Sequence, residues 1–570
     1  MLKTRKNALI AATLFLLPAV LGHPADLDVS ALPSQVGDLP ATPGDTLKLD
    51  LTGAYELALA RNLNLHVGRY DLAVANANVR GSGGIFDPTF NTFLNYDSTK
   101  QPTSTLLEGA NVAESENMRF GLGLNQLLPS GTQVGLEWSS FRRKTNSTFF
   151  FLNPSWDANL RATLTQPLLN GFGTTANRSA IIIAENIRDQ TAIGFEVQVI
   201  ELLNNVEQAY WELVATREGI AVTVQSLALA ERLLGETRQR VEVGTSAPID
   251  MVQSEATVAT RIQELIYANN AAANAEDNLK ALLGFDLPHE WQIRIETTDS
   301  YETEPVLPDL KQSIETALDK RPAILQQALE MQRLQHNVDV AKNRALPRFD
   351  LTGSYQFGGV SGTSTITDED GNQITIRDGL GDAARQIFNF DFPGWAVGLQ
   401  YSVPIGNHQA KEQLVANRYY RDRSGAQLAA LKQEITRQVR SAVRSLEDGA
   451  AAIDAAVAAR HLAERNLEAE QTKFDNGLST NFQVSQIQDA LATALFSEIR
   501  ARVDYRKSLA IYYGSTGTFL ESKNVEIADP GAPESVHDYW KDVEWLQFTN
   551  LKGSREDVTI PAEAVNTATD

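Results

Sequence analysis

Histidine and carboxylate side chains are the groups of this 570-residue chain that could bind a metal ion or transfer protons. The segment 368–373, DEDGNQ, begins like a calcium-binding loop, but its glycine comes too early and position 379 is Gly379 instead of an acid. We therefore interpret it as a solvated surface turn. The histidines are scattered, with no spacing typical of metal ligands: His23, His66, His289, His336, His408, His461 and His537.

Other catalytic patterns are missing from the sequence. It has no phosphate-binding loop, no glycine pattern for dinucleotides and no nucleophile elbow. Cysteine is absent, which rules out disulfides and thiolate metal sites. The 71 Asp and Glu residues are too many for any two to be singled out as an acid and a base. The sequence therefore predicts a protein that is not an enzyme and has no cofactor and no bound metal.

The first residues have the pattern of a cleaved signal peptide. Lys3, Arg5 and Lys6 precede the apolar run 8–21, and small residues follow near Gly22. The run has about 14 residues, whereas a helix needs about 20 to cross a bilayer. Cleavage after Gly22 would remove three positive charges and take the formal net charge from −21 to −24. A chain this negative is not expected to bind nucleic acid.

The way this exported chain could enter a membrane is narrowly limited. No cysteine follows the signal, so the lipid anchor of bacterial lipoproteins is not expected. No later segment is expected to be long and apolar enough to span a membrane as a helix. The chain would then have to enter as a β-barrel, because only helices and closed barrels satisfy every backbone polar group in lipid.

The elements that would position any site occur twice, because the chain contains an internal duplication. Pro167 pairs with Pro404 and Gly244 with Gly477, and the offset between the copies changes only where loops differ. Each copy is predicted to run from a helix through strands to a very long helix, a glycine turn and a last helix. Residues that match at an offset of 259 positions are Glu56, Ala58, Leu59, Pro88, Phe90 and Tyr96 with Glu315, Ala317, Leu318, Pro347, Phe349 and Tyr355.

Coiled-coil periodicity predicts the very long helices at 175–243 and 408–476. In the first, apolar residues recur at spacings of three, four and seven: Val199, Val206, Tyr210, Leu213, Ile220, Val224, Leu227 and Leu234. At about 1.5 Å per residue, each helix would be roughly 100 Å long, which is too long for a compact domain. From the helices alone, a soluble helical rod is an open alternative.

Six segments alternate apolar side chains with small or polar ones, as membrane-barrel strands do: 88–98, 118–126, 132–140, 156–166, 348–357 and 395–403. Any half-buried antiparallel sheet shows the same alternation of side chains. A barrel is favoured here because the chain is predicted to be exported and to contain two very long helices. Residues 127–132, LLPSGT, suit a tight turn. The first copy thus has an extra pair of strands, in the barrel or as an outer hairpin. The loops 99–116 and 360–393 are expected outside the cell.

The number of strands predicts an oligomer. A membrane barrel needs at least about eight strands, and one chain supplies roughly four to six. Several chains must therefore share one barrel, and helices leaving the same end of the strands would continue it as a tube. The predicted fold class is an α+β membrane protein with two internal repeats, in which a shared transmembrane β-barrel continues into a long α-helical coiled-coil tunnel.

Over 49–519 the chain resembles the TolC-like outer-membrane efflux family. The matching marks are the two copies, the strand-to-helix turns QPLLNGFG (166–173) and SVPIGN (402–407), and the two glycine turns. The resemblance implies a homotrimer in the outer membrane, surrounded by lipid, with a periplasmic tunnel. It also implies two partners: a periplasmic adaptor and an inner-membrane transporter of the RND, ABC or MFS class.

The domain organisation follows from the duplication and the resemblance. Two repeats are expected, at 49–284 with a hairpin tip near 244 and at 311–519 with a tip near 477. The remaining parts are a signal peptide (1–22), an N-terminal linker (23–48), an equatorial linker (285–310) and a C-terminal extension (520–570). The extension lies beyond the resemblance, and either packs around the waist of the tube with the equatorial linker or stays mobile.

The resemblance also transfers candidate site residues. It places the hairpin tips at the periplasmic mouth, where an adaptor docks: Gly244, Thr245, Ser246, Gly477, Leu478 and Ser479. The strand-to-helix turns contain Pro167, Gly171, Pro404 and Gly406. The candidate residues of the gate at the tunnel entrance are Asp250, Gln253, Gln483 and Gln486.

The candidate entrance departs from the family pattern. Gln483 and Gln486 stand where the best-studied members carry aspartates that bind cations, and an uncharged ring would lose most of that attraction. Asp250 matches a family acid that holds the mouth shut through a tyrosine and an arginine. Those partner positions are Phe474 and Ser479 here, which cannot make the same charged link. Asp250 therefore either serves the gate or caps the helix that follows the tip.

The predicted function is passive conduction to the cell exterior, in multidrug efflux or type I secretion. Substrates would be small molecules or secreted products received from the adaptor and the transporter. Opening would come from outward rotation of the tip helices. The alternative is an exported coiled-coil structural protein that spaces the envelope without conducting.

Overall fold

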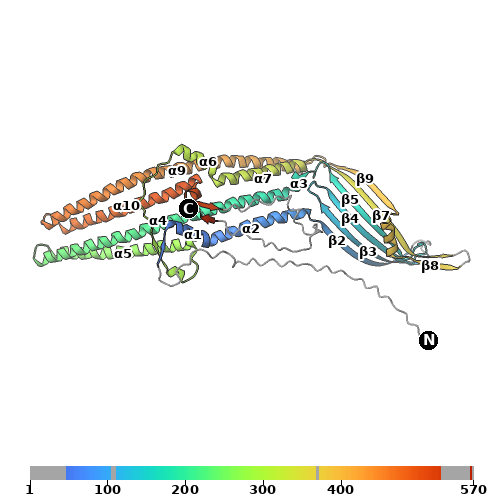
Figure 1. Ribbon diagram of the computed structural model, residues 1–570, viewed down its shortest axis with the longest axis horizontal. Helices are drawn as coiled ribbons and strands as arrows, with labels where there is room; N and C mark the ends of the chain where they lie inside the picture. The colour runs from blue at the N-terminus through green and yellow to red at the C-terminus, as the bar shows by residue number, and fades with distance from the viewer. Residues whose placement is uncertain (1–45, 104–108, 110, 368–371, 528–564, 568–570) are drawn as a thin grey trace, which may run out of the picture.

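The computed structural model describes residues 46–103, 109, 111–367, 372–527 and 565–567. The molecule is elongated, with a sheet at one end and long helices at the other (Figure 1). The predicted signal peptide, most of the predicted linker 23–48, the start of the predicted surface turn at 368–371 and most of the predicted C-terminal extension lie outside the described residues.

Six long antiparallel strands form the sheet, and each predicted alternating segment lies in one of them to within about one residue at either end, which is the usual margin. Their order is β2 (Thr89–Pro102), β3 (Val112–Leu127), β4 (Gln133–Thr145), β5 (Ser155–Pro167), β7 (Arg348–Thr367) and β9 (Pro393–Ser402). The short strand β8 (Gln373–Arg377) pairs with the far end of β7. Within the described part of the chain, the outer edges of β2 and β9 have no strand partner.

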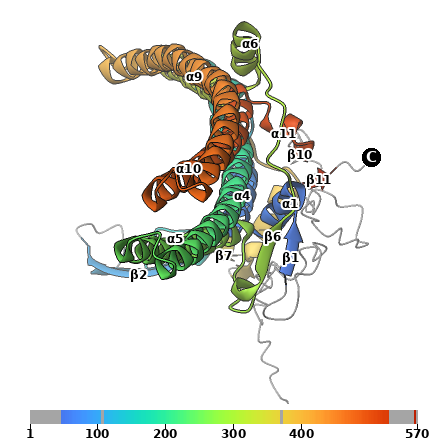
Figure 2. The ribbon, with the colours of Figure 1, turned by 90° about the vertical axis from the view of Figure 1, so that its left-hand side faces the viewer.

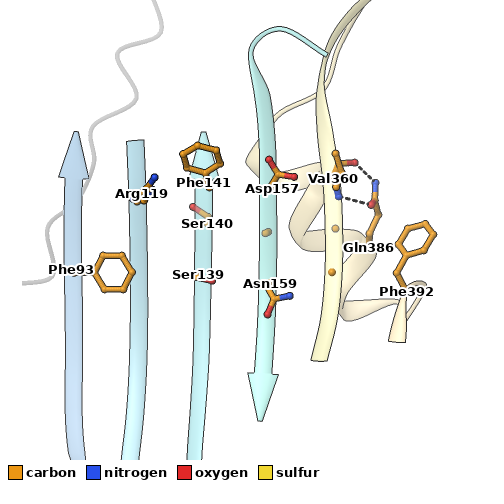
Figure 3. Close-up of a pocket in the computed structure, with 13 residues that line it drawn as sticks. Phe93, Arg119, Ser139, Ser140, Phe141, Asp157, Asn159, Val360, Gln386 and Phe392 are labelled. Atoms are coloured by element: carbon orange, nitrogen blue, oxygen red, sulfur yellow. Dashed lines mark hydrogen bonds between the residues drawn. The ribbon is translucent and has the colours of Figure 1, made fainter. Parts of the chain in front are cut away.

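Strand register sorts the alternating side chains onto two faces. Leu122, Trp138 and Leu160 form one cross-strand row on the apolar face. Much of this face is exposed, and Trp395 of β9 is 75% exposed. A row on the opposite face contains small and polar residues beside one aromatic: Phe93, Gly121, Ser139, Asn159 and Gly358. This second face is hollowed by a recess of about 660 Å³ (Figure 3).

The segments predicted as outer loops contain regular structure. β2 and β3 continue their pairing out to Pro102 and Val112, and β7 runs on to Thr367 to pair with β8. The next element, helix α8 (Leu380–Phe388), lies against the apolar face of the sheet, where its Ala383 and Ile387 pack on β5 and β7. The described parts of these two segments therefore contain strands and a helix, because backbone pairing continues beyond the alternating segments.

The turn predicted at 127–132 joins β3 to β4. The Leu128 N–H donates to the Thr132 carbonyl at 2.8 Å, and the Gly131 N–H donates to the Leu128 carbonyl at 2.8 Å. Gly131 has a φ of +90°, which glycine tolerates best. The extra pair of strands is therefore part of one continuous sheet, and the detached outer hairpin does not form.

Four helices lie side by side in an open arc, in the order α5 (Pro248–Leu283), α4 (Ser179–Glu242), α10 (Asn481–Thr516) and α9 (His408–Asp475) (Figure 2). α4 and α9 contain 64 and 68 residues, so each is roughly 100 Å long. The first long helix begins later than predicted. A short helix, α3 (Thr174–Asn177), ends at Arg178 before α4 starts.

The shorter helices repeat the duplication. α1 (Leu51–Arg61) and α2 (Leu63–Gly83) lead into β2, as α6 (Leu310–Lys320) and α7 (Pro322–Arg344) lead into β7. Ala58 and Ala317, which match at the offset of 259, are both 0% exposed. The two copies therefore bury the same position of the same helix.

Helix α4 is packed differently along its length. Its first half buries the predicted residues Val199, Val206 and Tyr210 in the main core. One stretch of α4 meets the length and composition of a membrane span, contrary to expectation, and 44% of that stretch is buried inside the protein. Farther along, the buried face shifts from the predicted seam to smaller residues and Val224 is exposed. The cause is close packing with α10, whose Phe496 lies 3.1 Å from the Cβ position of Gly219.

The described parts of the predicted linkers and of the C-terminal extension lie together at the waist of the molecule. β1 (Thr46–Leu49) and β6 (Arg294–Thr297) pair in parallel, and the short 3-10 helix η4 (Glu290–Gln292) precedes β6. Helix α11 (Phe519–Ser522) buries Phe519 against Tyr55 of α1. Two short strands, β10 (Val525–Ile527) and β11 (Val565–Thr567), pair beyond it. These elements lie outside the arc of long helices (Figure 2).

Candidate gate and docking site at the hairpin tips

The first hairpin tip ends α4 with a Schellman motif centred on Gly244. The Gly244 N–H donates to the Val241 carbonyl at 3.1 Å, and the Thr245 N–H donates to the Arg240 carbonyl at 2.8 Å. Gly244 has a φ of +80°, where a side chain would clash with the following carbonyl. Pro248 then begins α5, at a position where a helix makes no use of an N–H.

The second hairpin tip repeats this motif. The Gly477 N–H donates to the Phe474 carbonyl at 3.0 Å, and the Leu478 N–H donates to the Lys473 carbonyl at 2.8 Å. Gly477 has a φ of +75°. Thr480 then caps the start of α10. The duplication is thus preserved down to single backbone hydrogen bonds.

Asp250 and Gln483 hold equivalent positions, six residues after the tip glycines, and each caps its own helix. Asp250 Oδ2 accepts the Ala247 N–H at 3.1 Å. Gln483 Oε1 accepts the Thr480 N–H at 3.3 Å, while Thr480 Oγ1 accepts the Gln483 N–H at 3.4 Å. This is the capping-box arrangement. Of the two roles that the sequence leaves open for Asp250, the cap is the contact that its carboxylate makes.

Asn481 joins the two hairpins through a contact that no sequence pattern indicates. Its Nδ2 donates to the Asp250 carbonyl at 3.2 Å and to Ser254 Oγ. Asn481 and Ser254 are 8% and 3% exposed, so this bridge is shielded from water. No local pattern could reveal it, because Ser254 is 227 residues away in the chain.

The positions that the family uses for gate partners have other contacts here. Phe474 is buried with Leu233 and Val484, and the guanidinium of Arg240 stacks on its ring at 4.0 Å. The single hydroxyl proton of Ser479 lies between two acceptors, the carboxylate of Glu470 and, at a longer 3.1 Å, Gln483 Oε1. Phe474 therefore serves as core, and Ser479 supports the turn.

Gln253 and Gln486 are exposed on the second turns of α5 and α10. Gln253 borders a narrow gap between the hairpins, whose opposite side is formed by Asn481 and Ser485. Thr245 and Ser246 direct their N–H groups to the Arg240 carbonyl, and Leu478 is 79% exposed. The structure therefore brings the residues of each tip together at one end of the helical arc.

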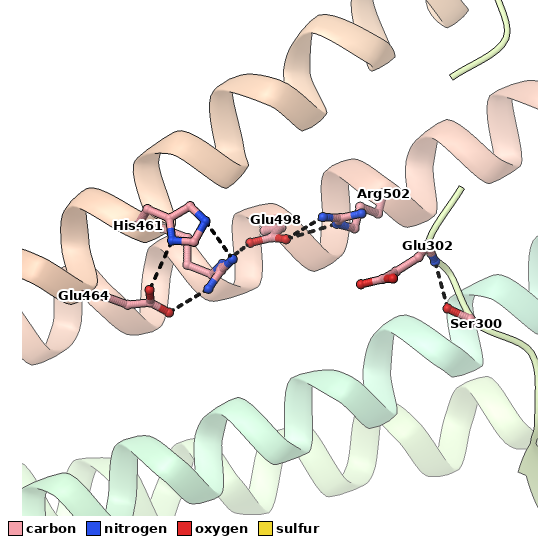
Figure 4. Close-up of polar contacts among 7 residues, drawn as sticks. Ser300, Glu302, His461, Glu464, Glu498 and Arg502 are labelled. Atoms are coloured by element: carbon pink, nitrogen blue, oxygen red, sulfur yellow. Dashed lines mark hydrogen bonds and ion pairs between the residues drawn. The ribbon is translucent and has the colours of Figure 1, made fainter. Parts of the chain in front are cut away.

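Farther along the second hairpin, a charged cluster holds α9 to α10. Glu498 of α10 accepts hydrogen bonds from Arg460 of α9 and from Arg502 at 2.9 Å (Figure 4). Arg460 also binds Glu464 at 2.7 Å. Burial disfavours the charged form of Glu498, but the hydrogen bonds from Arg502 and Arg460 outweigh it and lower the pKa of Glu498. The cluster therefore links the helices with an ionised carboxylate.

The two strand-to-helix turns are both anchored on the end of α7. After Pro167, Gly171 has a φ of +85° and donates its N–H to Asn343 Oδ1 at 2.8 Å. After Pro404, Gly406 has a φ of +88°. The next residue, Asn407, donates its Nδ2 to the Ala345 carbonyl at 3.0 Å. Glycine thus allows each strand to turn sharply into its long helix.

Comparison with known proteins identifies the family. A family model described as outer membrane efflux protein matches residues 131–285 and 313–518, and the chain belongs to this family. It is 24% identical over 542 residues to the pyoverdine export outer membrane protein OpmQ of Pseudomonas aeruginosa, covering 92% of this chain and 99% of that protein. It is 23% identical over 368 residues to the outer membrane protein TolC of Escherichia coli, covering 62% of this chain and 71% of that protein.

A solved structure shows the same fold. The outer-membrane channel OprN matches with a TM-score of 0.59 and 15% identity, covering 82% of this chain and 90% of that one. The predicted relationship to TolC-like proteins is therefore confirmed. The chain is an outer-membrane protein with a periplasmic extension, and its family consists of efflux channels.

Proposed function

We propose that three copies of this chain form one exit duct, with a shared outer-membrane barrel that continues into a periplasmic helical tunnel. The carrying observation is that, among the residues that the structure describes, six long strands form one sheet whose two outer edges, on β2 and β9, are open. Six strands are too few to close a membrane barrel, which needs at least about eight. Because six is even, β9 of one copy would meet β2 of the next in antiparallel orientation. Three copies would give eighteen strands.

The helical arc supports the same assembly. Its outer helices, α5 and α9, lie at opposite ends of the open arc (Figure 2). Among the described residues, α9 also contacts α6 and α7, and α5 also contacts α1. In the proposed trimer, α5 of one copy packs against α9 of the next and closes the tunnel. Outer-membrane lipid covers the exposed apolar face of the sheet, and the small and polar face lines the lumen. The proposed repeats that build this duct are 49–284 and 311–519.

The duct conducts passively, and an inner-membrane transporter supplies the energy through a periplasmic adaptor. The tips are the proposed adaptor surface, through Gly244 to Ser246 and Gly477 to Ser479. The similarity to OpmQ, whose name states pyoverdine export, extends over 92% of this chain and supports small-molecule export. Type I secretion is the second proposed use of the duct. It would need the same kinds of partner, a periplasmic adaptor and an inner-membrane transporter.

The proposed gate lies just behind the tips. Gln253 and Gln486 are exposed there, and the side chains of Asp250 and Gln483 hold the ends of their helices. Opening would require α5 and α10 to move with the tips. The buried bridge from Asn481 would hold these two helix starts together in the closed state, and it would have to break as they separate during opening.

Detergent extraction followed by planar-bilayer recording tests this function. We expect a particle with three times the mass of the mature chain and a stable ionic conductance. A trimer without conductance would favour the structural spacer. A monomer that conducts would show that one chain seals its own sheet, which would refute the shared barrel.

A further inference from the structure

We propose that the recess on the small and polar face of the sheet binds planar aromatic anions as they leave through the barrel. This inference rests on the proposed function, which makes that face the wall of the lumen. The recess has a volume of about 660 Å³, within the range of roughly 300–1,000 Å³ typical of small-molecule sites. It would occur once in each copy of the chain.

The floor of the recess is formed by strands with small side chains. Ser139 and Gly358 leave the backbone of β4 and β7 open, between Phe93 on one side and Phe392 on the other (Figure 3). Phe93 lies across Gly121 of β3, where a Cβ would be 2.4 Å from the ring. The glycine therefore fixes the ring as one wall, with the floor beside it free for a flat molecule.

The opposite wall is held by hydrogen bonds to the open edge of β7. Gln386 of α8 binds Val360 twice, accepting its N–H and donating to its carbonyl, both at 3.0 Å. The Phe392 carbonyl accepts the Gly358 N–H at 3.2 Å. These contacts fill the gap between β8 and β9, so the wall is built into the fold and does not depend on a loose loop.

Arg119 supplies the positive charge. Its guanidinium lies 5.2 Å from the centre of the Phe141 ring, and in the described part of the chain no carboxylate pairs with it. Two nearby lysines are paired, Lys100 with Glu114 and Lys144 with Glu116. Arg143, whose guanidinium lies 6.0 Å from the same Phe141 ring, has no carboxylate partner among the described residues either, but it does not line the recess. A guanidinium stacked on an aromatic ring presents a planar set of donors to an anion.

Asp157 defines the other end of the ligand. In the strand register Arg119 is opposite Phe141, and Phe141 is opposite Asp157. Neighbouring strands are about 4.8 Å apart, so the two charged residues are roughly 10 Å apart at the backbone. A ring system with an acid at one end spans that distance, with its aromatic surface against Phe141. A hydrogen-bond donor at its far end would reach Asp157.

Block of single-channel current by naphthalene-2-sulfonate tests the proposal. We expect the unmodified protein to show brief blocking events with naphthalene-2-sulfonate and none with methanesulfonate, which has the charge without the ring. Arg119→Gln should weaken the apparent Kd about tenfold, because it removes a charge-assisted contact. Phe141→Leu should weaken it severalfold through the lost stacking.

Arg161→Gln is the matched control. Arg161 lies on the same face of the sheet, opposite Glu137 and Gln356 in register, and does not line the recess. We expect it to leave the block unchanged. Equal weakening by both substitutions would mean that the charge of the whole lumen attracts the probe, which overturns the proposal. Equal block of the unmodified protein by both sulfonates would overturn it without any variant. Complete absence of conductance would instead refute the proposed function.

Discussion

Replacing Gly477 by alanine isolates the backbone requirement of the hairpin tip. Gly477 has a φ of +75°, and a Cβ built on it finds no atom within 4 Å. Alanine therefore meets no neighbour, and the cost is that of its own left-handed backbone, about 1–2 kcal/mol. Gly425 in α9 also has open space around its Cβ position but lies within a helix. There alanine should stabilise by about 0.5–1 kcal/mol.

Hydrogen–deuterium exchange of the tip peptides measures the difference in stability between the Gly477→Ala and Gly425→Ala variants. The amides of Gly477 and Leu478 are protected by the carbonyls of Phe474 and Lys473. A loss of about 1–2 kcal/mol should increase local opening, and hence exchange, about 5- to 30-fold. Gly244→Ala should have the same effect at the other tip. Gly425→Ala should not accelerate exchange there.

Two results would contradict this reasoning at different levels. If the tip amides exchange at the same rate in the Gly477→Ala and Gly425→Ala variants, the left-handed turn is not the reason that glycine is needed at position 477. If exchange rises as expected but the adaptor still co-purifies in full from envelopes with Gly477→Val, the turn is correct and the tip is not the docking surface. The two measurements therefore separate the geometry from its proposed use.

Three further changes test the gate and the helical stalk. Multivalent cations added from the tip side should block conductance poorly, and Gln486→Asp should strengthen the block; an unchanged block would place that residue away from the entrance. Asn481→Ala should raise the resting open probability about fivefold through the loss of about 1 kcal/mol of bridging, and an unaltered resting current would show that the bridge does not hold the entrance. The pKa of Glu498 is lowered from its ordinary value of 4.5, because hydrogen bonds from Arg502 and Arg460 outweigh its burial. The folded state thus binds this proton less readily than the unfolded state, so the contribution to stability is complete above pH 4.5 and is lost as pH falls through the lowered pKa. Tm measured by circular dichroism should fall over that range, and Glu498→Gln should reduce the fall; an identical pH profile would contradict the assignment.

The strands and the repeated order of elements could be predicted because their signals are local. A period of two residues marks each strand, and register then follows from placing the apolar faces together. The glycine turns are visible for the same reason, since left-handed backbone has a strong residue preference. Gly131, Gly244 and Gly477 all have positive φ. These features need no knowledge of distant partners.

The contacts that hold the tips together could not be predicted because their partners are distant in sequence. Asn481 finds Ser254 only once two hairpins are side by side. The shift of the buried face of α4 depends likewise on how closely α10 approaches Gly219. The sequence leaves the role of Asp250 open, because a carboxylate six residues after the turn suits a gate as well as a cap. The structure adds the hydrogen bond that the Asp250 carboxylate accepts from the Ala247 N–H.

The sheet and the helices each support the proposal that neighbouring copies complete the assembly. As far as the chain is described, the sheet ends in unpaired backbone at β2 and β9, which in a membrane would leave polar groups without partners. The outer helices have exposed apolar side chains: Ile266 of α5 is 62% exposed, and Tyr419 of α9 is 69% exposed. Backbone pairing in lipid and side-chain packing in water have different physical causes. A copy on each side would satisfy both along one continuous boundary, so the stalk should lose its order whenever the barrel cannot close.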